Sequence, residues 1–228
     1  MAALAGAVDM MPGMPTTPAR ALAHLLIGAP TLEQGIAWLE ERTGVRAAPG
    51  GSHPGLGTWN ALASLGPAQY IEVIAPDPSQ PGVATFYAPR LRDLREPRIV
   101  TWAARGADLA GGFAASLPAD LSCEPARPGS RIRPDGARLS WTLAFPTHRT
   151  QGAFSGLLPF LIEWASEEHH PGKSTPQGLA LIDLHLRHPG AEALNHALAS
   201  LGFEGRATGD AYASMSVELE TPRGRVVL

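Results

Sequence analysis

The feature that most constrains this chain is an internal repeat, because residues 22–45 and 99–121 follow one plan. The first stretch, "LAHLLIGAPTLEQGIAWLEERTGV", predicts a strand, a turn and a helix with Thr31 as its N-cap and Gly44 as its terminator. The second, "IVTWAARGADLAGGFAASLPADL", predicts a strand, a turn of small residues and a helix that is capped by Asp108 and ended by Pro118. A duplicated architecture is therefore expected.

Strand signals follow each predicted helix, and a shorter echo of the plan closes the chain. The predicted strands are 58–66 and 69–75 in the first unit, and 130–133, 137–145 and 159–165 in the second, with further strands near 46–50 and 122–127. The "PDG" of residues 134–136 predicts a hairpin turn. The echo comprises a strand at 178–186, a helix at 190–203 and a closing hairpin. The chain is thus expected to consist of repeated βαββ-type pieces.

Composition excludes several classes of function. The formal net charge is −3, from 18 Lys and Arg against 21 Asp and Glu, and no block of like charge suggests a nucleic-acid or membrane-surface partner. Cys123 is the only cysteine, so an intrachain disulfide is impossible and a reducing cytoplasm is the expected location. Residues 1–18 are interpreted as a flexible leader, and no apolar run is long enough to span a membrane.

Two glutamates lie inside apolar, strand-like runs: Glu72 in "YIEVIAP" and Glu163 in "FLIEWAS". A carboxylate removed from water normally protonates, pairs with a cation or binds a metal. Alternate residues of a strand share a face, so Glu72 is expected to point with Tyr70, and Glu163 with Leu161. His24 lies in the first predicted strand. The question is what these side chains face.

The segments that carry these residues resemble a known family. Residues 20–172, with "AHLLIGAPTLEQGIAWLEERTGV", "GGSHPGLGTWNALASLGPAQYIEVIAPDP", "IRPDGARLSWTLAF" and "LPFLIEW", are similar to the bacterial glyoxalase-like domain family of the vicinal oxygen chelate superfamily. The resemblance implies an α+β fold in which paired βαβββ modules form a curved mixed sheet around a cleft. The expected units are a module at 19–95, a module at 96–166 and a partial βαββ repeat at 167–228 that packs on the same domain.

The resemblance also implies a site. Superfamily enzymes hold a divalent metal in the cleft, so His24, Glu72 and Glu163 are expected to converge on Zn, Mn, Fe or Ni with open positions for substrate. Alignment of the two units places Thr101, a poor ligand, opposite His24. The implied function is a metal-dependent lyase, isomerase or dioxygenase acting on an oxygen-rich small molecule, in which Glu72, Glu163 or His53 transfers the proton.

Alternatives remain open at this point. His24 can form an ion pair with Glu72, and Glu163 can meet Arg131 or Arg133 from the neighbouring hairpin. The missing fourth ligand favours a metal-free protein that binds or sequesters a small molecule, as bleomycin-resistance proteins do. A pure interaction module would instead need a flat surface without a cleft. The oligomeric state is expected to be monomer or homodimer.

A glycine- and proline-rich loop supplies the other candidates. His53, Trp59 and Asn60 lie in or beside residues 49–60, where glycines let the backbone approach a ligand closely. Together with Thr101, these three residues are the predicted substrate-binding set. The adjacent His169 and His170 are weaker candidates, because solvent exposure is the commoner fate of such a pair.

Overall fold

The computed structural model of the 228-residue chain describes residues 20–83, 91–133, 136–204 and 206–228. The predicted leader at 1–18 and most of the predicted "PDG" turn lie outside these residues. No helix among the described residues is long and apolar enough to cross a membrane.

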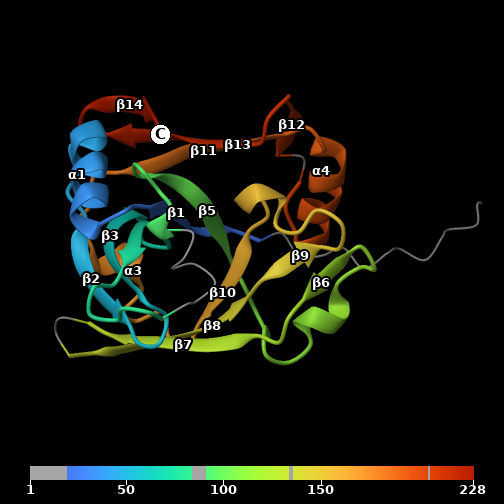
Figure 1. Ribbon diagram of the computed structural model, residues 1–228, viewed down its shortest axis with the longest axis horizontal. Helices are drawn as coiled ribbons and strands as arrows, with labels where there is room; N and C mark the ends of the chain where they lie inside the picture. The colour runs from blue at the N-terminus through green and yellow to red at the C-terminus, as the bar shows by residue number, and fades with distance from the viewer. Residues whose placement is uncertain (1–19, 84–90, 134–135, 205) are drawn as a thin grey trace, which may run out of the picture.

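One mixed sheet organises the molecule (Figure 1). Its eight strands, in spatial order, are β2 (Ala48–His53), β3 (Thr58–Gly66), β4 (Gln69–Pro76), β1 (Leu22–Gly28), β5 (Arg98–Arg105), β10 (Phe160–Trp164), β8 (Arg138–Ala144) and β7 (Arg127–Ile132). In the first half β1 runs parallel to β4, and in the second half β5 runs parallel to β10. The halves join where β1 and β5 pair antiparallel. The expected α+β fold with a curved mixed sheet is confirmed.

The sheet curves until its two edge strands approach each other. The guanidinium of Arg131 on β7 donates to the carbonyl oxygen of Gly50 on β2, with 2.5 Å between Nη1 and O. Arg131 is buried at this position. The bond thus ties the last strand of the sheet order to the first and leaves an inner face that is largely enclosed.

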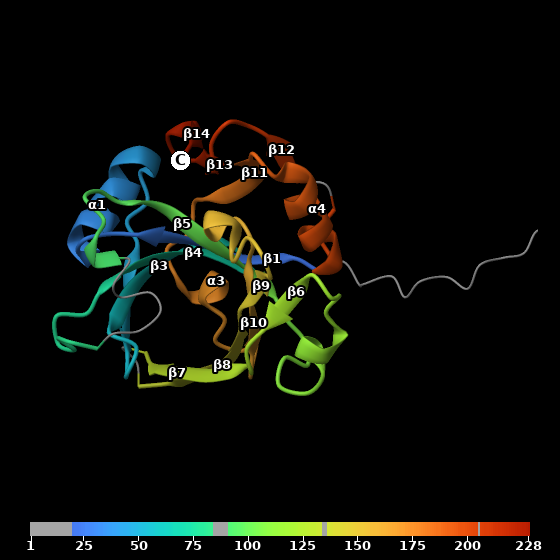
Figure 2. The same ribbon diagram turned by 45° about the vertical axis from the view of Figure 1, so that its right-hand side comes forward.

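A second, four-stranded sheet comes from the C-terminal part of the chain. Its order is β12 (Ala207–Gly209), β11 (Ala180–His188), β13 (Ser214–Thr221) and β14 (Gly224–Val227), with α4 (Ala191–Ser200) between β11 and β12. The remaining elements are η1 (Phe113–Ser116), β6 (Leu121–Cys123), β9 (Pro146–His148), η2 (Phe154–Gly156) and α3 (Pro171–Ser174). Figures 1 and 2 both place the C-terminal sheet on the side opposite β7 and β8.

Helix α1 (Leu32–Thr43) begins and ends as the sequence predicts. The hydroxyl of Thr31 accepts the N–H of Gln34, with 3.2 Å between the heavy atoms. Gly44 ends the helix with φ 78°, a left-handed conformation that glycine adopts without strain. Gly35 lets the helix approach β4, because a Cβ there would overlap the Val73 side chain. The helix thus covers the outer face of the first half.

The predicted second-half helix is wrong in its extent. Residues 108–112 form turns, and only η1 is helical, as a short 3₁₀ segment. Asp108, the predicted cap, has φ 52°. Gly111 and Gly112 weaken a helix here, since each glycine costs about 1 kcal/mol relative to alanine.

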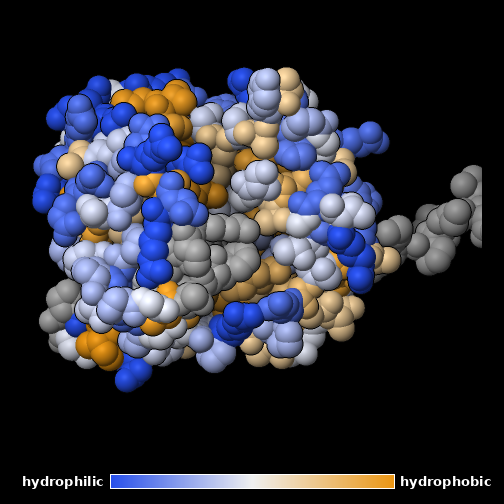
Figure 3. Space-filling view, in the orientation of Figure 1, coloured by the Kyte–Doolittle hydropathy of each residue, from blue (hydrophilic) through white to orange (hydrophobic). Residues whose placement is uncertain are grey.

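The two faces of the large sheet carry separate apolar clusters. The outer cluster joins alternate residues such as Leu25 and Ile71 to α1 and to the C-terminal sheet, through residues such as Leu39 and Val217. The inner cluster contains Leu26, Ile74, Trp141, Phe160 and Ile162. The rim of the molecule in Figure 3 is mostly hydrophilic. The alternation of each strand therefore decides which side chains can reach the inner cavity.

Candidate functional site

The inner face of the eight-stranded sheet encloses a cavity of about 420 Å³ that residues of both halves line, here called the first pocket. Its polar end is formed by His24, His53, Asn60 and Glu72. Its apolar walls include Tyr70, Trp141, Phe160 and Trp164. The volume and the mixture of apolar walls with a few convergent polar groups are typical of small-molecule sites.

Glu72 lies on β4 at the centre of the polar end and is 8% exposed. Its Oε1 accepts the amide of Asn60 at 2.8 Å, and its Oε2 lies 3.4 Å from Nε2 of His24. Burial by itself would raise the pKa of Glu72, but the hydrogen bond and charge of His24, followed by His53 and Asn60, lower it to about 2. The carboxylate is therefore ionised at neutral pH, and the contact of His24 with Glu72 that the sequence left open as an alternative to a metal site is present.

His24 lies on β1 and is held by aromatic side chains. Its ring stacks on Tyr70 with 4.4 Å between centroids and meets the edge of Phe160 at 5.5 Å. Burial and the nearby Glu72 charge raise the pKa of Tyr70 well above its usual value, so the phenol stays neutral. His24 thus faces Glu72 in a fixed orientation.

His53 ends β2, and its partners define its tautomer. Nδ1 lies 2.9 Å from the hydroxyl of Thr58, and Nε2 lies 3.2 Å from the Asn60 amide nitrogen. Since that amide can only donate, Nε2 of His53 accepts and Nδ1 carries the hydrogen. Burial lowers the pKa of His53, against the opposing charge of Glu72. Asn60 therefore donates one N–H to Glu72 and the other to a neutral His53.

Several polar atoms of residues that line the first pocket have no partner among the described residues. They are Nδ1 of His24, Oδ1 of Asn60 and Nε1 of Trp164. Buried polar groups in native proteins nearly always have a partner, so a cluster of orphaned atoms calls for an explanation. All three belong to residues that line the first pocket. The cluster therefore points to a ligand with complementary groups.

The expected convergence of Glu163 with Glu72 is wrong. Glu163 does share a face with Leu161, as predicted, but that face is the outer one, because Phe160 and Ile162 of β10 belong to the inner cluster. Its carboxylate accepts the backbone N–H groups of Asp108 at 3.1 Å and Leu109 at 2.9 Å. In the described part of the chain, Glu163 forms an ion pair with neither Arg131 nor Arg133, the two arginines considered from the sequence. Glu163 instead supports the turn that replaces the predicted helix.

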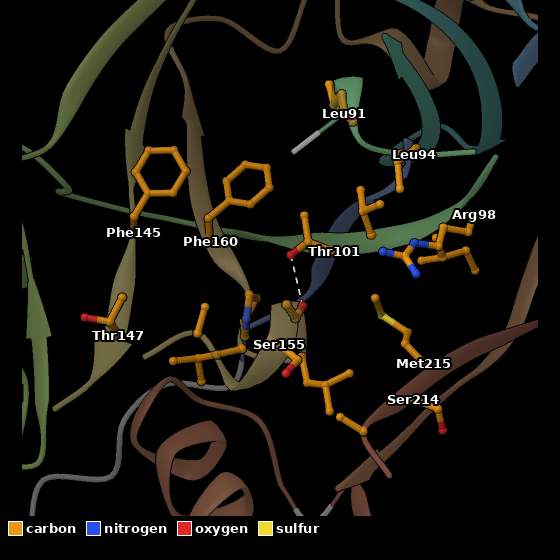
Figure 4. Close-up of a pocket in the computed structure, with 18 of the residues that line it drawn as sticks. Leu91, Leu94, Arg98, Thr101, Phe145, Thr147, Ser155, Phe160, Ser214 and Met215 are labelled. Atoms are coloured by element: carbon orange, nitrogen blue, oxygen red, sulfur yellow. Dashed lines mark hydrogen bonds between the residues drawn. The ribbon is translucent and has the colours of Figure 1, made fainter. Parts of the chain in front are cut away.

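Two members of the predicted substrate-binding set also lie elsewhere. Trp59 packs against the outer cluster, because its neighbour Asn60 points inward and strand residues alternate. Thr101 lines a separate cavity, and its hydroxyl donates to the carbonyl oxygen of Gly156 at 3.0 Å (Figure 4). His53 and Asn60 do line the first pocket.

The residues present do not fit the predicted metal centre. Strand register pairs His24 with Ala103 and Thr101 with Leu26, so the two residues that the sequence alignment matched are not partners in the sheet. The described residues of the second half that line the first pocket are arginine, proline, glycine, aliphatic and aromatic residues. The second half therefore contributes no carboxylate or imidazole. Within the described ranges, no group of three or more His, Cys, Asp or Glu is placed to hold a metal ion. Catalytic zinc sites generally use three protein ligands, and the direct pair here is His24 with Glu72.

His170 is fully buried, which sequence reasoning did not predict. Its ring meets the edges of Tyr70 at 5.6 Å and Trp164 at 5.6 Å, behind the pocket wall. Its Nδ1 accepts the N–H of Gly172 and so caps α3. Adjacent histidines suggest exposure on composition alone, but α3 packs against β3 and β4 and brings His170 with it.

Acid is expected to destabilise the protein through His170. Burial lowers the pKa of His170 to about 4, so the folded state binds fewer protons than the unfolded state between the ordinary value of 6.5 and pH 4. Stability should fall across that window as pH falls, by about 1–2 kcal/mol after solvent screening. Urea unfolding at several pH values measures this slope.

The matched variant for this prediction is His170→Asn, whose side chain retains an acceptor for the cap but does not titrate. The slope between pH 6.5 and 4 should flatten in this variant. An unchanged slope would show that another group carries the acid sensitivity.

The aromatic walls are the part of the site that sequence reasoning missed. Trp141 and Trp164 lie opposite each other on β8 and β10, with ring centroids 5.4 Å apart. Ring centroids of His53 and Trp141 are 6.1 Å apart. Alternation in "FLIEW" could have found Trp164, since it is two residues from the inner Ile162.

Comparison with known proteins agrees with the fold. A family model described as "Glyoxalase-like domain" matches residues 22–202. A hypothetical protein from Staphylococcus aureus is 12% identical, with a TM-score of 0.60 over 90% of this chain and 83% of that chain.

Two other solved structures are more distant in shape. Methylmalonyl-CoA epimerase from Mycobacterium tuberculosis is 25% identical, with a TM-score of 0.42 over 68% of this chain and 95% of that one. A mutant of 4-hydroxymandelate synthase from Streptomyces coelicolor is 13% identical, with a TM-score of 0.43 over 92% of this chain and 63% of that one. A search of curated proteins found no match.

The resemblance noted from the sequence is confirmed. Because the family model spans most of the chain, this protein belongs to the glyoxalase-like domain family.

Proposed function

We propose that the first pocket binds a small, planar organic molecule that donates a hydrogen bond to Glu72, and that binding does not require a metal. The observation that carries this proposal is an ionised carboxylate buried at one end of an aromatic-walled cavity. A carboxylate has about four lone-pair sites, and Asn60 and His24 occupy two of them. Glu72 can therefore accept an N–H or O–H from a ligand.

The aromatic walls support a flat ligand. Trp141 and Trp164 meet at an interplanar angle of 67°, so their rings bound the cavity from different directions. Aromatic faces and edges favour stacked or edge-on contacts with another ring. The unpartnered N–H of Trp164 offers a donor to an acceptor on the same ligand. A molecule with adjacent donor and acceptor groups on a flat ring matches this set.

The electrostatics favour binding over proton abstraction. A general base works best with a pKa near the operating pH, whereas the pKa of Glu72 is about 2. His53 is neutral but its Nε2 accepts from Asn60, so protonation there would break a buried hydrogen bond. The catalytic roles predicted for Glu72, His53 and Glu163 are therefore less well supported than the sequestration of a small molecule. We favour this second function over a metal-dependent lyase, isomerase or dioxygenase.

The test uses 2-quinolone, a planar bicyclic lactam with an N–H beside its carbonyl, and quinoline, which lacks the donor. Titration is followed by quenching of tryptophan fluorescence, first in chelator and then with added Zn, Mn, Fe(II) or Ni. We expect saturable 2-quinolone binding that is unchanged by chelator, and quinoline binding about tenfold weaker, the equivalent of one charge-assisted hydrogen bond.

Two results would count against the proposal. Binding that appears only after a metal is added would support the metal-dependent alternative. Equal binding of quinoline and 2-quinolone would show that Glu72 does not select for a donor.

A further inference from the structure

A second cavity of about 580 Å³ lies beside the first pocket. We infer that this second pocket binds an amphipathic monocarboxylate, with its apolar chain inside and its carboxylate on Arg98. The volume is within the range of small-molecule sites. The inference does not depend on the function proposed for the first pocket.

Parts of the chain that are far apart in sequence build the second pocket. They include the start of β5, the loop around η2 and the C-terminal segment with Ser214 and Met215 (Figure 4). Ser214 and Met215 lie beyond residue 202, where the family match ends. The C-terminal sheet therefore closes a cavity that the matched domain does not complete by itself.

The wall is mostly apolar, and Arg98 is the one cationic side chain among the described residues that line it. Leu91, Leu94, Phe145 and Phe160 surround the cavity, and Figure 4 shows the guanidinium of Arg98 turned toward it. Among the described residues that line it, no side chain is acidic. A chain with one anionic end is the ligand chemistry that this wall complements.

Arg98 is available to such a ligand. The described part of the chain gives its side chain no hydrogen bond or ion pair. Leu228 also lines the cavity, but its backbone oxygen accepts the N–H of Val217, and no ion pair joins Leu228 to Arg98. An arginine without a protein partner at the edge of an apolar cavity suits a carboxylate, which it can bind through two parallel hydrogen bonds.

The loop that forms one wall is held in a strained conformation. Phe154, Ser155 and Gly156 have φ of 48°, 58° and 93°, and left-handed non-glycine residues persist only where their surroundings enforce them. Two bonds from β5 do so: Thr101 donates to Gly156, and Nε1 of Trp102 donates to the carbonyl oxygen of Leu157 at 2.8 Å. Such strain clusters at ligand sites, and here it shapes the cavity.

The two pockets are neighbours but are separated by a pair of rings. Phe145 and Phe160 line both cavities and stack with 5.5 Å between centroids. Variants on the far side of this partition therefore affect one pocket and spare the other.

The test is calorimetric titration of the full chain with decanoate, and with decanol as its uncharged match. We expect decanoate to bind at one site, more tightly than decanol. Arg98→Gln should weaken decanoate binding about tenfold and leave decanol unaffected, whereas Arg98→Lys should keep part of the preference. Ser214→Trp, which fills the cavity from an exposed position, should abolish binding of both.

The matched control is Arg95→Gln, which removes an exposed charge nearby that does not line the cavity. It should leave decanoate binding unchanged. The inference is overturned if decanoate does not bind saturably, if Arg95→Gln and Arg98→Gln act equally, or if binding survives Ser214→Trp. Circular dichroism checks that each variant is folded. If Ser214→Trp does not fold, the Arg98 variants still test the inference.

Discussion

Asn60→Asp is expected to destabilise the protein by about 3–5 kcal/mol at neutral pH, although it changes only one atom type. The donor that lies 2.8 Å from Oε1 of Glu72 would become a carboxylate oxygen. Two buried carboxylates at that distance cannot both be ionised, so one of them must take up a proton. The same change removes the donor to Nε2 of His53.

The variant should also reverse the sign with which this site makes the free energy of unfolding depend on pH. In the natural protein the folded-state pKa of Glu72 is about 2 against an ordinary 4.5, so its contribution is present at neutral pH and is lost as pH falls between these values. In Asn60→Asp the shared proton raises a folded-state pKa above its unfolded value. The loss of stability caused by the substitution should therefore become smaller as pH falls from 7 toward the unfolded-state pKa. Urea unfolding between pH 7 and pH 5 measures the difference.

Asn195→Asp provides the matched control. Asn195 on α4 bonds both backbone groups of Ala207 at 2.8 Å, and no carboxylate is among its bonded partners. It should lose stability without gaining any on mild acidification. If Asn60→Asp behaves like Asn195→Asp, the close contact of Asn60 with an ionised Glu72 is wrong.

Glu72→Gln is expected to weaken 2-quinolone binding by about 10- to 100-fold, because it replaces a charged acceptor of the ligand N–H by a neutral one. Glu163→Gln should leave binding unchanged. The Glu163 carboxylate accepts the backbone N–H groups of Asp108 and Leu109. Its replacement should therefore lower only the free energy of unfolding, by about 1–2 kcal/mol. Titration and urea unfolding of both variants separate the two roles.

The pair of glutamates provides its own control, since the substitution is identical and both lie in strands of the same sheet. Equal loss of binding in the two variants would restore the convergent site that the sequence predicted. Loss in Glu163→Gln alone would place the ligand outside the first pocket.

The sequence predicted much of the fold because its signals are local. Thr31 and Gly44 mark the ends of α1, and alternation correctly groups Glu72 with Tyr70. Alternation states which residues share a face, but it does not state which face looks inward. Which face looks inward depends on how the second half packs. The inward orientation was predicted correctly for Glu72 and incorrectly for Glu163.

The second-half helix failed for a related reason. Asp108 is a good cap by type, but Gly111 and Gly112 weaken the helix that would follow. Glu163, 55 residues away, binds the N–H of Asp108 itself. A long-range carboxylate thus stabilises a turn where local pattern predicts a helix, and this partnership is invisible without the tertiary structure. The inward position of Arg131 and the burial of His170 depend on packing in the same way.

The most direct test is a crystal structure of the protein with 2-quinolone, grown in chelator. Our account predicts a ligand between the aromatic walls of the first pocket with its N–H on Glu72, and Glu163 still on the backbone of the 108–109 turn. A structure in which the ligand lies elsewhere, or in which Glu163 joins Glu72 at one site, would contradict it.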